Sequence, residues 1–107
     1  MFQRLFALCM LLCVLAVPPA RATEYVISQR GKVFSQSEIT IQLGDTIVFK
    51  NDDDIAHNVF SKTEGLKFNL KIQSPGDRGT VLLTTEGTAA VRCAFHPTMK
   101  LTVTVKK

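Results

Sequence analysis

The sequence ITIQLGDTIVFK, residues 39–50, alternates apolar and polar side chains on both sides of a Gly-Asp turn signal. Successive side chains of a strand point to opposite faces, so such alternation is typical of a strand with one face in a core and the other in water. The same pattern returns in FNLKI, residues 68–72, and in LTVTVK, residues 101–106. We therefore predict half-buried β-strands in all of these regions.

Shorter segments of the same kind lie between these strands. The less regular candidates are residues 25–28, 33–34, 58–61, 80–84 and 89–93. Clusters of Gly, Pro, Asn and Asp separate them, and no segment carries an apolar stripe of period 3.6 over the length of a helix. Roughly seven to nine short strands with regular turns indicate an all-β fold. We predict a single Greek-key β-sandwich, with a small barrel as the nearest alternative.

The beginning of the chain has the features of an export signal. Arg4 precedes an apolar run at 5–17, which ends in a proline pair and the small-residue sequence Ala20-Arg21-Ala22. This order is typical of a secretory signal peptide, and the apolar run is too short to cross a bilayer. A retained membrane anchor is the weaker alternative. We predict a signal peptide at 1–22 and, at 23–107, one exported domain, periplasmic or otherwise outside the cytoplasm, that does not insert into a membrane.

Cleavage after Ala22 would remove two of the three cysteines and leave Cys93 alone. One cysteine cannot form an internal disulfide, and a leftover thiol in an oxidising compartment is either an intermolecular partner or a ligand. Because a domain this small often needs extra stabilisation, a metal is an attractive explanation. The net charge falls from +4 to +2 when Arg4 and Arg21 are removed, which is too weak to indicate nucleic acid or an anionic membrane as the partner.

The most informative motif is Cys93-x2-His96-x2-Met99. Cys93 shares a strand face with Val91, and Pro97 should interrupt the strand, so the motif would form a tight loop between two strands. It offers a thiolate, an imidazole and a thioether. Two histidines and a cysteine with a weakly bound methionine are typical of electron-transfer copper sites, and His57 is the one other histidine in the sequence.

Each candidate ligand also has an ordinary explanation. A single histidine such as His57 is more often a turn or surface residue than a ligand, a free cysteine is commonly an inert buried thiol, and a methionine such as Met99 commonly fills a core. Copper binding becomes the favoured interpretation because one site accounts for both histidines and for Cys93 together.

These residues, with the segment GDTIVFKN at 44–51 and His57-Asn58-Val59, resemble the cupredoxins, or type 1 blue copper proteins. The loop at 93–99 is most similar to that of the small amicyanin-like members associated with methylamine utilisation. The resemblance covers about residues 38–107. It implies one copper ion with His57, Cys93 and His96 as equatorial ligands and Met99 as the axial ligand. The chain departs from its relatives at 89–92, where they often carry aromatic residues before the cysteine, so the core beneath the metal is expected to come from Phe34, Phe49, Phe60 and Phe68.

The resemblance further implies a role for the residues that surround the ligands. Asn58 is expected to hydrogen-bond to the 93–99 loop and to direct its N–H at the thiolate. Phe95 stands where similar loops usually have proline, and its N–H could donate a second hydrogen bond to the Cys93 sulfur. Such a bond would favour the reduced site and raise the reduction potential.

The function expected is transfer of single electrons to and from a transient protein partner, by a monomer that is not an enzyme. The sequence shows no nucleophile–base pair, catalytic carboxylate pair or phosphate loop. The acidic run Asp52-Asp53-Asp54 is read as a solvated turn rather than a calcium or docking site. Two alternatives remain, namely a periplasmic copper carrier or storage protein and a metal-free β-sandwich that acts as a binding module.

Overall fold

The computed structural model describes residues 22–107 and consists of strands, turns and loops without a helix in that part of the chain. The predicted signal peptide lies outside the described residues except for Ala22. The strands are β1 (Glu24–Arg30), β2 (Val33–Phe34), β3 (Glu38–Gln42), β4 (Thr46–Asn51), β5 (His57–Ser61), β6 (Phe68–Gln73), β7 (Arg78–Leu82), β8 (Gly87–Arg92) and β9 (Lys100–Lys106).

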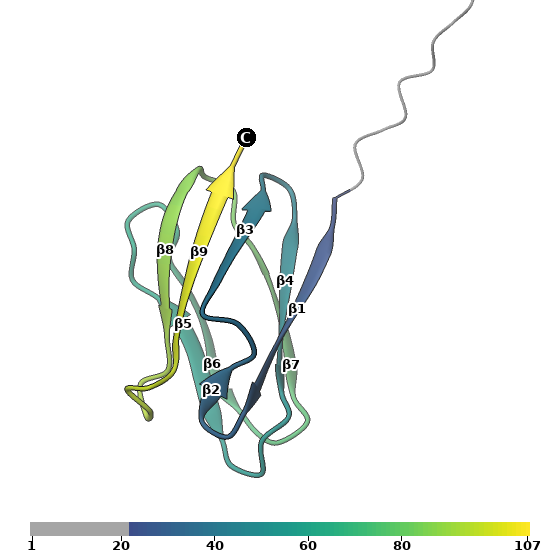
Figure 1. The fold of residues 1–107 in the computed structure, drawn as a ribbon, viewed down its shortest axis with the longest axis vertical. Coiled ribbons are helices and arrows are strands. Elements are labelled where there is room, and N and C mark those ends of the chain that lie inside the picture. Colours follow the sequence, from purple (N-terminus) through teal and green to yellow (C-terminus); the bar gives the residue numbers. More distant parts are fainter. Residues whose placement is uncertain (1–21) are drawn as a thin grey trace, which may run out of the picture.

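The strands form two sheets that face each other (Figure 1). One sheet has the order β2-β1-β4-β7 and the other has the order β3-β9-β8-β5-β6. The pairs β1–β4 and β3–β9 are parallel, whereas the other pairs are antiparallel. Neighbours in a sheet that are distant in sequence are the mark of Greek-key connections. The predicted all-β sandwich is therefore confirmed.

The core lies between the sheets and follows the predicted alternation. Ile39 and Ile41 on β3, for example, point inward between exposed Glu38, Thr40 and Gln42. The fully buried Phe49 is central, because its ring contacts Phe34 edge-on and Phe68 in a stacked arrangement, both with centroids 6.0 Å apart. Aromatic pairs at this spacing add to the energy of apolar burial.

Two predicted core positions are wrong, Phe60 because it alternates with the buried Val59 along a regular β5 and Ile72 because of a β-bulge on β6. Along β5, Val59 is buried while Phe60 points outward, where its ring lies 5.7 Å from Lys62 Nζ. On β6, Lys71 has a φ of 60° and the pairing with β5 shifts by one residue. An extra residue reverses the facing of those that follow, so Ile72 is 61% exposed and Gln73 turns inward.

Three connections meet at one end of the sandwich, at the bottom of Figure 1. They are the β1–β2 turn at 31–32, the β4–β5 loop at 52–56 and the β8–β9 loop at 93–99. Hydrogen bonds join the first of these connections to each of the others. All the candidate ligands lie here. Within residues 22–107, no helix has the length and apolarity needed to cross a membrane.

Candidate metal centre

The 93–99 loop is short and fixed at both ends by buried side chains. Strand β8 turns Ala89 and Val91 into the core, and Cys93 continues on the same face with 5% of its surface exposed. At the other end Met99 is fully buried, and its N–H donates to the His96 carbonyl at 3.0 Å. His96 is half-buried between exposed neighbours. The sequence-based placement of Cys93 on the Val91 face is confirmed.

His57 begins β5 and is fully buried. Its Nε2 donates a hydrogen bond to Asp53 Oδ2 at 2.8 Å, while its Nδ1 is buried and has no hydrogen-bond partner among residues 22–107. A buried ring nitrogen with no partner is unfavourable, so this atom calls for an explanation. The His57 ring lies close to that of His96, with centroids 4.9 Å apart and planes at 74°. The structure therefore brings together the two histidines that are 39 positions apart in the sequence.

Asn58 connects β5 to the cysteine loop through two hydrogen bonds. Its backbone N–H is directed at Cys93 Sγ from 3.5 Å, and its side-chain Oδ1 accepts the N–H of Ala94 at 2.7 Å. These are the contacts expected of Asn58 from the sequence. No hydrogen bond from Phe95 N–H to the sulfur is present within residues 22–107, so the proposed influence of Phe95 on the cysteine stays a prediction.

Asp53 is a functional candidate that the sequence-based reasoning missed. Its carboxylate is 10% exposed, whereas Asp52 is 36% exposed and pairs with Lys50 at 3.1 Å. The solvated-turn interpretation holds for Asp52 and Asp54 but is wrong for Asp53. Hydrogen bonds from the His57 side chain and from the backbone of Lys32 and Gly31 lower the pKa of Asp53 to about 2, in spite of partial burial. The sequence did contain a signal for this role, because Asp53 is an acidic residue four positions before the candidate ligand His57.

Asn51 gives the 52–56 loop its shape. Its Oδ1 accepts the Asp53 N–H at 2.9 Å, and its Nδ2 donates to the carbonyls of Ile55 and Gln73, each at 2.9 Å. Asn51 is fully buried, so these contacts are shielded from water. A buried asparagine that uses both ends of its amide fixes the path of the chain from β4 to His57.

The donor set fits copper in its chemistry. The end of the sandwich holds an imidazole nitrogen with no partner in the described part of the chain, a second imidazole, a buried thiol and a buried thioether, which are ligands that copper prefers. Within residues 22–107, no three His, Cys, Asp or Glu side chains lie close enough together to hold a metal ion as they stand. The candidate ligands therefore lie near one another and offer suitable donor atoms, but they do not form a closed coordination shell.

Comparison with known proteins identifies the family. Residues 22–106 match the copper binding proteins of the plastocyanin/azurin family. Methylamine utilization protein MauL of Methylorubrum extorquens is 30% identical over 84 residues, which cover 78% of this chain and 74% of MauL. Plastocyanin of Lactuca sativa is 34% identical over 80 residues, which cover 64% of this chain and 81% of that protein.

Solved structures agree with this result. A purple cupredoxin from Nitrosopumilus maritimus superimposes with a TM-score of 0.68 at 29% identity, covering 77% of this chain and 99% of the cupredoxin. An amicyanin variant in the Cu(I) form gives a TM-score of 0.72 at 21% identity, covering 78% of this chain and 82% of amicyanin. At that identity the likeness to amicyanin shows the fold alone.

The chain belongs to the plastocyanin/azurin family of copper-binding proteins. The predicted family and the predicted copper cofactor are therefore confirmed. A redox role, rather than an enzymatic one, is supported at the level of the family.

Proposed function

We propose that this protein is an exported carrier of single electrons, which holds one copper ion through His57, Cys93, His96 and Met99. The observation that carries the proposal is the buried Nδ1 of His57, which has no hydrogen-bond partner in the described structure and belongs to a ring 4.9 Å from that of His96. A metal ion bound at this nitrogen would remove the cost of leaving it unsatisfied.

The chain's own residues would fix the ligands before the metal arrives. Asp53 accepts a hydrogen bond from the Nε2–H of His57. Because the proton is then on Nε2, the lone pair of Nδ1 is directed into the site. Asn58 donates to Cys93 Sγ and so favours an electron-rich sulfur. A thiolate, imidazoles and a thioether would hold copper in a site suited to outer-sphere transfer of one electron. A frame of paired strands around the loops would limit movement between the two redox states.

Electrons would pass between the copper and a partner protein through the His96 ring. Its ring is half-buried, and the loop beside it exposes Ala94, Phe95 and Pro97, with 52% of Phe95 accessible to solvent. A small apolar surface of this kind suits a brief contact with another redox protein. The relative MauL is named for methylamine utilization, so a redox protein of that pathway is one candidate partner to test.

The test is a visible absorption spectrum of the purified exported protein during titration with Cu(II), with Cys93→Ala in parallel. An intense thiolate-to-copper band that saturates at one equivalent and is lost in Cys93→Ala supports the proposal. His57→Ala should weaken the same band, because it removes the nitrogen without a partner. Weak absorption without a charge-transfer band would contradict it.

A second measurement separates an electron carrier from a copper carrier. Both would bind the metal, but a copper carrier must release it readily to an acceptor. We expect the loaded protein to be reduced and reoxidised repeatedly in the presence of a Cu(I) chelator without losing its band. Rapid transfer of copper to the chelator would favour the carrier or storage alternative.

A further inference from the structure

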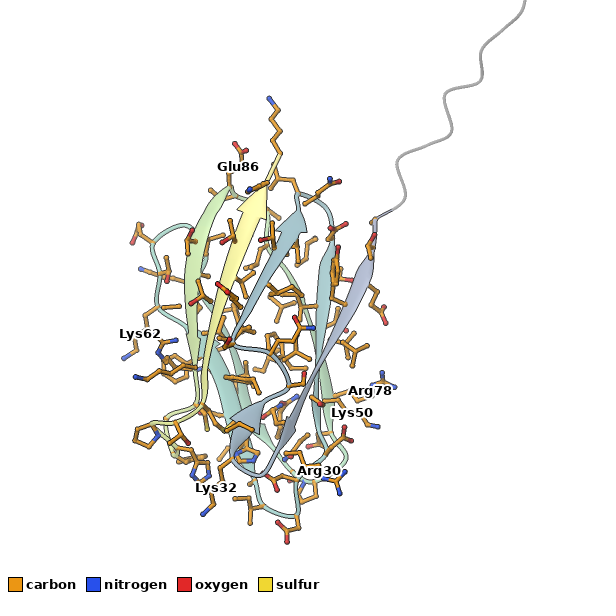
Figure 2. The ribbon with its side chains drawn as sticks, in the orientation of Figure 1. Arg30, Lys32, Lys50, Lys62, Arg78 and Glu86 are labelled. Carbon is orange, nitrogen blue, oxygen red and sulfur yellow. The ribbon has the colours of Figure 1, made fainter. Side chains whose placement is uncertain are left out.

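The turn between β1 and β2 has an unusual backbone. Gly31 and Lys32 have φ values of 62° and 59°, the pair of positive angles that defines a type I′ hairpin turn. Glycine adopts this conformation freely, whereas a residue with a Cβ such as lysine adopts it at a cost. The Lys32 side chain is exposed and contributes none of the hydrogen bonds described below (Figure 2). The conformation is therefore held by contacts of the backbone.

The backbone of Lys32 contacts both loops that carry candidate ligands. Its N–H donates to Asp53 Oδ2 at 3.0 Å, and this same oxygen accepts His57 Nε2 at 2.8 Å. Its carbonyl accepts the hydroxyl of Thr98 at 3.0 Å. Thr98 lies between His96 and Met99 in the 93–99 loop. One residue of a hairpin turn is thus hydrogen-bonded to the His57 side and to the cysteine side of the site.

We propose that the 31–32 turn is a positioning element of the copper site, which holds the His57 loop and the 93–99 loop in a fixed relation through Asp53 and Thr98. This inference rests on the proposed function for its role toward copper. The arrangement itself belongs to the metal-free chain.

The physical consequence is that each loop loses freedom before metal binds. The Lys32 N–H fixes the Asp53 carboxylate, which fixes the tautomer and ring orientation of His57. Thr98 fixes the segment between two other candidate ligands. Loss of a group that orients a metal ligand typically lowers metal affinity about 10- to 100-fold. Loss of either link should therefore weaken copper retention without removing a ligand.

The decisive variant is Thr98→Val, which keeps the side-chain shape and removes the hydroxyl donor. We expect copper to be lost to a chelator about tenfold faster than from the wild type. Thr98→Ser keeps a hydroxyl and should restore the wild-type rate. Thr102→Val is the matched control, because Thr102 is an exposed threonine on β9 whose hydroxyl makes no hydrogen bond within the described residues.

Lys32 itself gives a complementary pair of variants. Lys32→Gly should lower copper retention much less than Lys32→Val does, because the contacts use backbone atoms and glycine accepts the positive φ. Lys32→Val should lower retention, because a β-branched residue resists this conformation. An equal loss of retention in the two variants would indicate that the lysine charge matters, and full retention in both would show that the turn conformation does not affect the site. Either result would overturn the backbone explanation.

A measurement on metal-free protein separates failure of this inference from failure of the proposed function. Hydrogen exchange of the Lys32 amide should be slow in the wild type and in Thr98→Ser, and at least several-fold faster in Asp53→Asn, whereas global unfolding of Thr98→Val should match that of the wild type. A rapidly exchanging Lys32 amide in the wild type would overturn the positioning role. If the wild type binds no copper but this amide is protected through Asp53, the connection between the loops stands and the proposed function fails.

Discussion

The backbone N–H of Asn58 on β5 points at the sulfur of Cys93 in the β8–β9 loop from 3.5 Å, although the two residues are 35 positions apart in the sequence. The Asn58 side chain strengthens this connection, because its Oδ1 accepts the N–H of Ala94 at 2.7 Å. Residues from β5 and from the β8–β9 loop are thereby held together beside the buried thiol. The two bonds act on different parts of Asn58, so they can be separated by mutation.

Asn58→Ala removes the side-chain bond and keeps the backbone N–H. We expect the metal-free protein to lose about 1 kcal/mol of unfolding free energy, since the bond to Ala94 lies near the surface. The charge-transfer band of the copper-loaded protein should shift, because the loop that carries Cys93 is less constrained. Denaturant unfolding and absorption spectra measure the two effects.

Asn69→Ala is a suitable control for this experiment. Asn69 also accepts a backbone N–H through its Oδ1, from Lys71 at 2.7 Å, but it lies on β6 in an exposed position. It should change stability slightly and leave the band in place. An Asn58→Ala protein with the wild-type spectrum would show that this side chain does not order the cysteine loop.

Met99→Leu separates the packing role of Met99 from a ligand role. The swap conserves volume, so we expect the unfolding free energy of the metal-free protein to change by less than about 1.5 kcal/mol. If Met99 contacts copper, the loaded protein should show a different absorption spectrum and a changed reduction potential. Leu101→Met is the matched control, because Leu101 is equally buried on β9 and is not a candidate ligand. An unchanged spectrum in Met99→Leu would restrict Met99 to the core.

Much of the fold could be predicted because alternation and burial coincide in the regular strands. Ile39 and Ile41, for example, face the core as the pattern requires. Ile72 could not be placed correctly, because the bulge at Lys71 changes the register of pairing without any glycine or proline to signal it. Phe60 faces outward for a simpler reason, because it alternates with Val59, which takes the core position on β5. Hydrophobicity alone cannot tell which face of a strand such a residue takes.

The candidate ligands could be identified because few residues of the described chain have the right chemistry. Their supporting contacts could not be. The bonds of Lys32 to Asp53 and to Thr98 join positions that are 21 and 66 apart in the sequence and depend on a backbone carbonyl and a backbone N–H. Backbone N–H and carbonyl groups recur along the whole chain, so no pattern of side chains predicts which of them will form a hydrogen bond.

The stability of the metal-free protein should depend on pH through Asp53. In the unfolded chain this carboxyl takes up a proton near its ordinary pKa of 3.8, whereas in the folded protein hydrogen bonds from His57 and Lys32 lower the pKa to about 2. The folded state therefore binds fewer protons between these values. The contribution of Asp53 to stability is complete above about pH 4 and is lost as the pH falls toward 2.

Denaturant unfolding of the metal-free wild type and of Asp53→Asn from pH 6 to pH 2 measures this effect. The difference between the two proteins should be largest at the upper end and should shrink below about pH 4. Asp54→Asn is the control, because Asp54 is exposed and makes no side-chain hydrogen bond within the described residues. A difference that stays constant over the whole range would contradict the lowered pKa of Asp53.

Phe95→Pro tests whether the residue before His96 influences the potential. Proline removes the N–H that Phe95 could direct at the Cys93 sulfur, and the reduced, more electron-rich site would lose that support. A hydrogen bond of about 1 kcal/mol corresponds to about 40 mV for one electron, so we expect protein-film voltammetry to show a potential lower by about that amount. Phe95→Ala keeps the N–H and removes the exposed ring, and it should retain the potential while weakening contact with a partner. An unchanged or higher potential in Phe95→Pro would leave Asn58 as the one backbone donor that acts on this sulfur within residues 22–107.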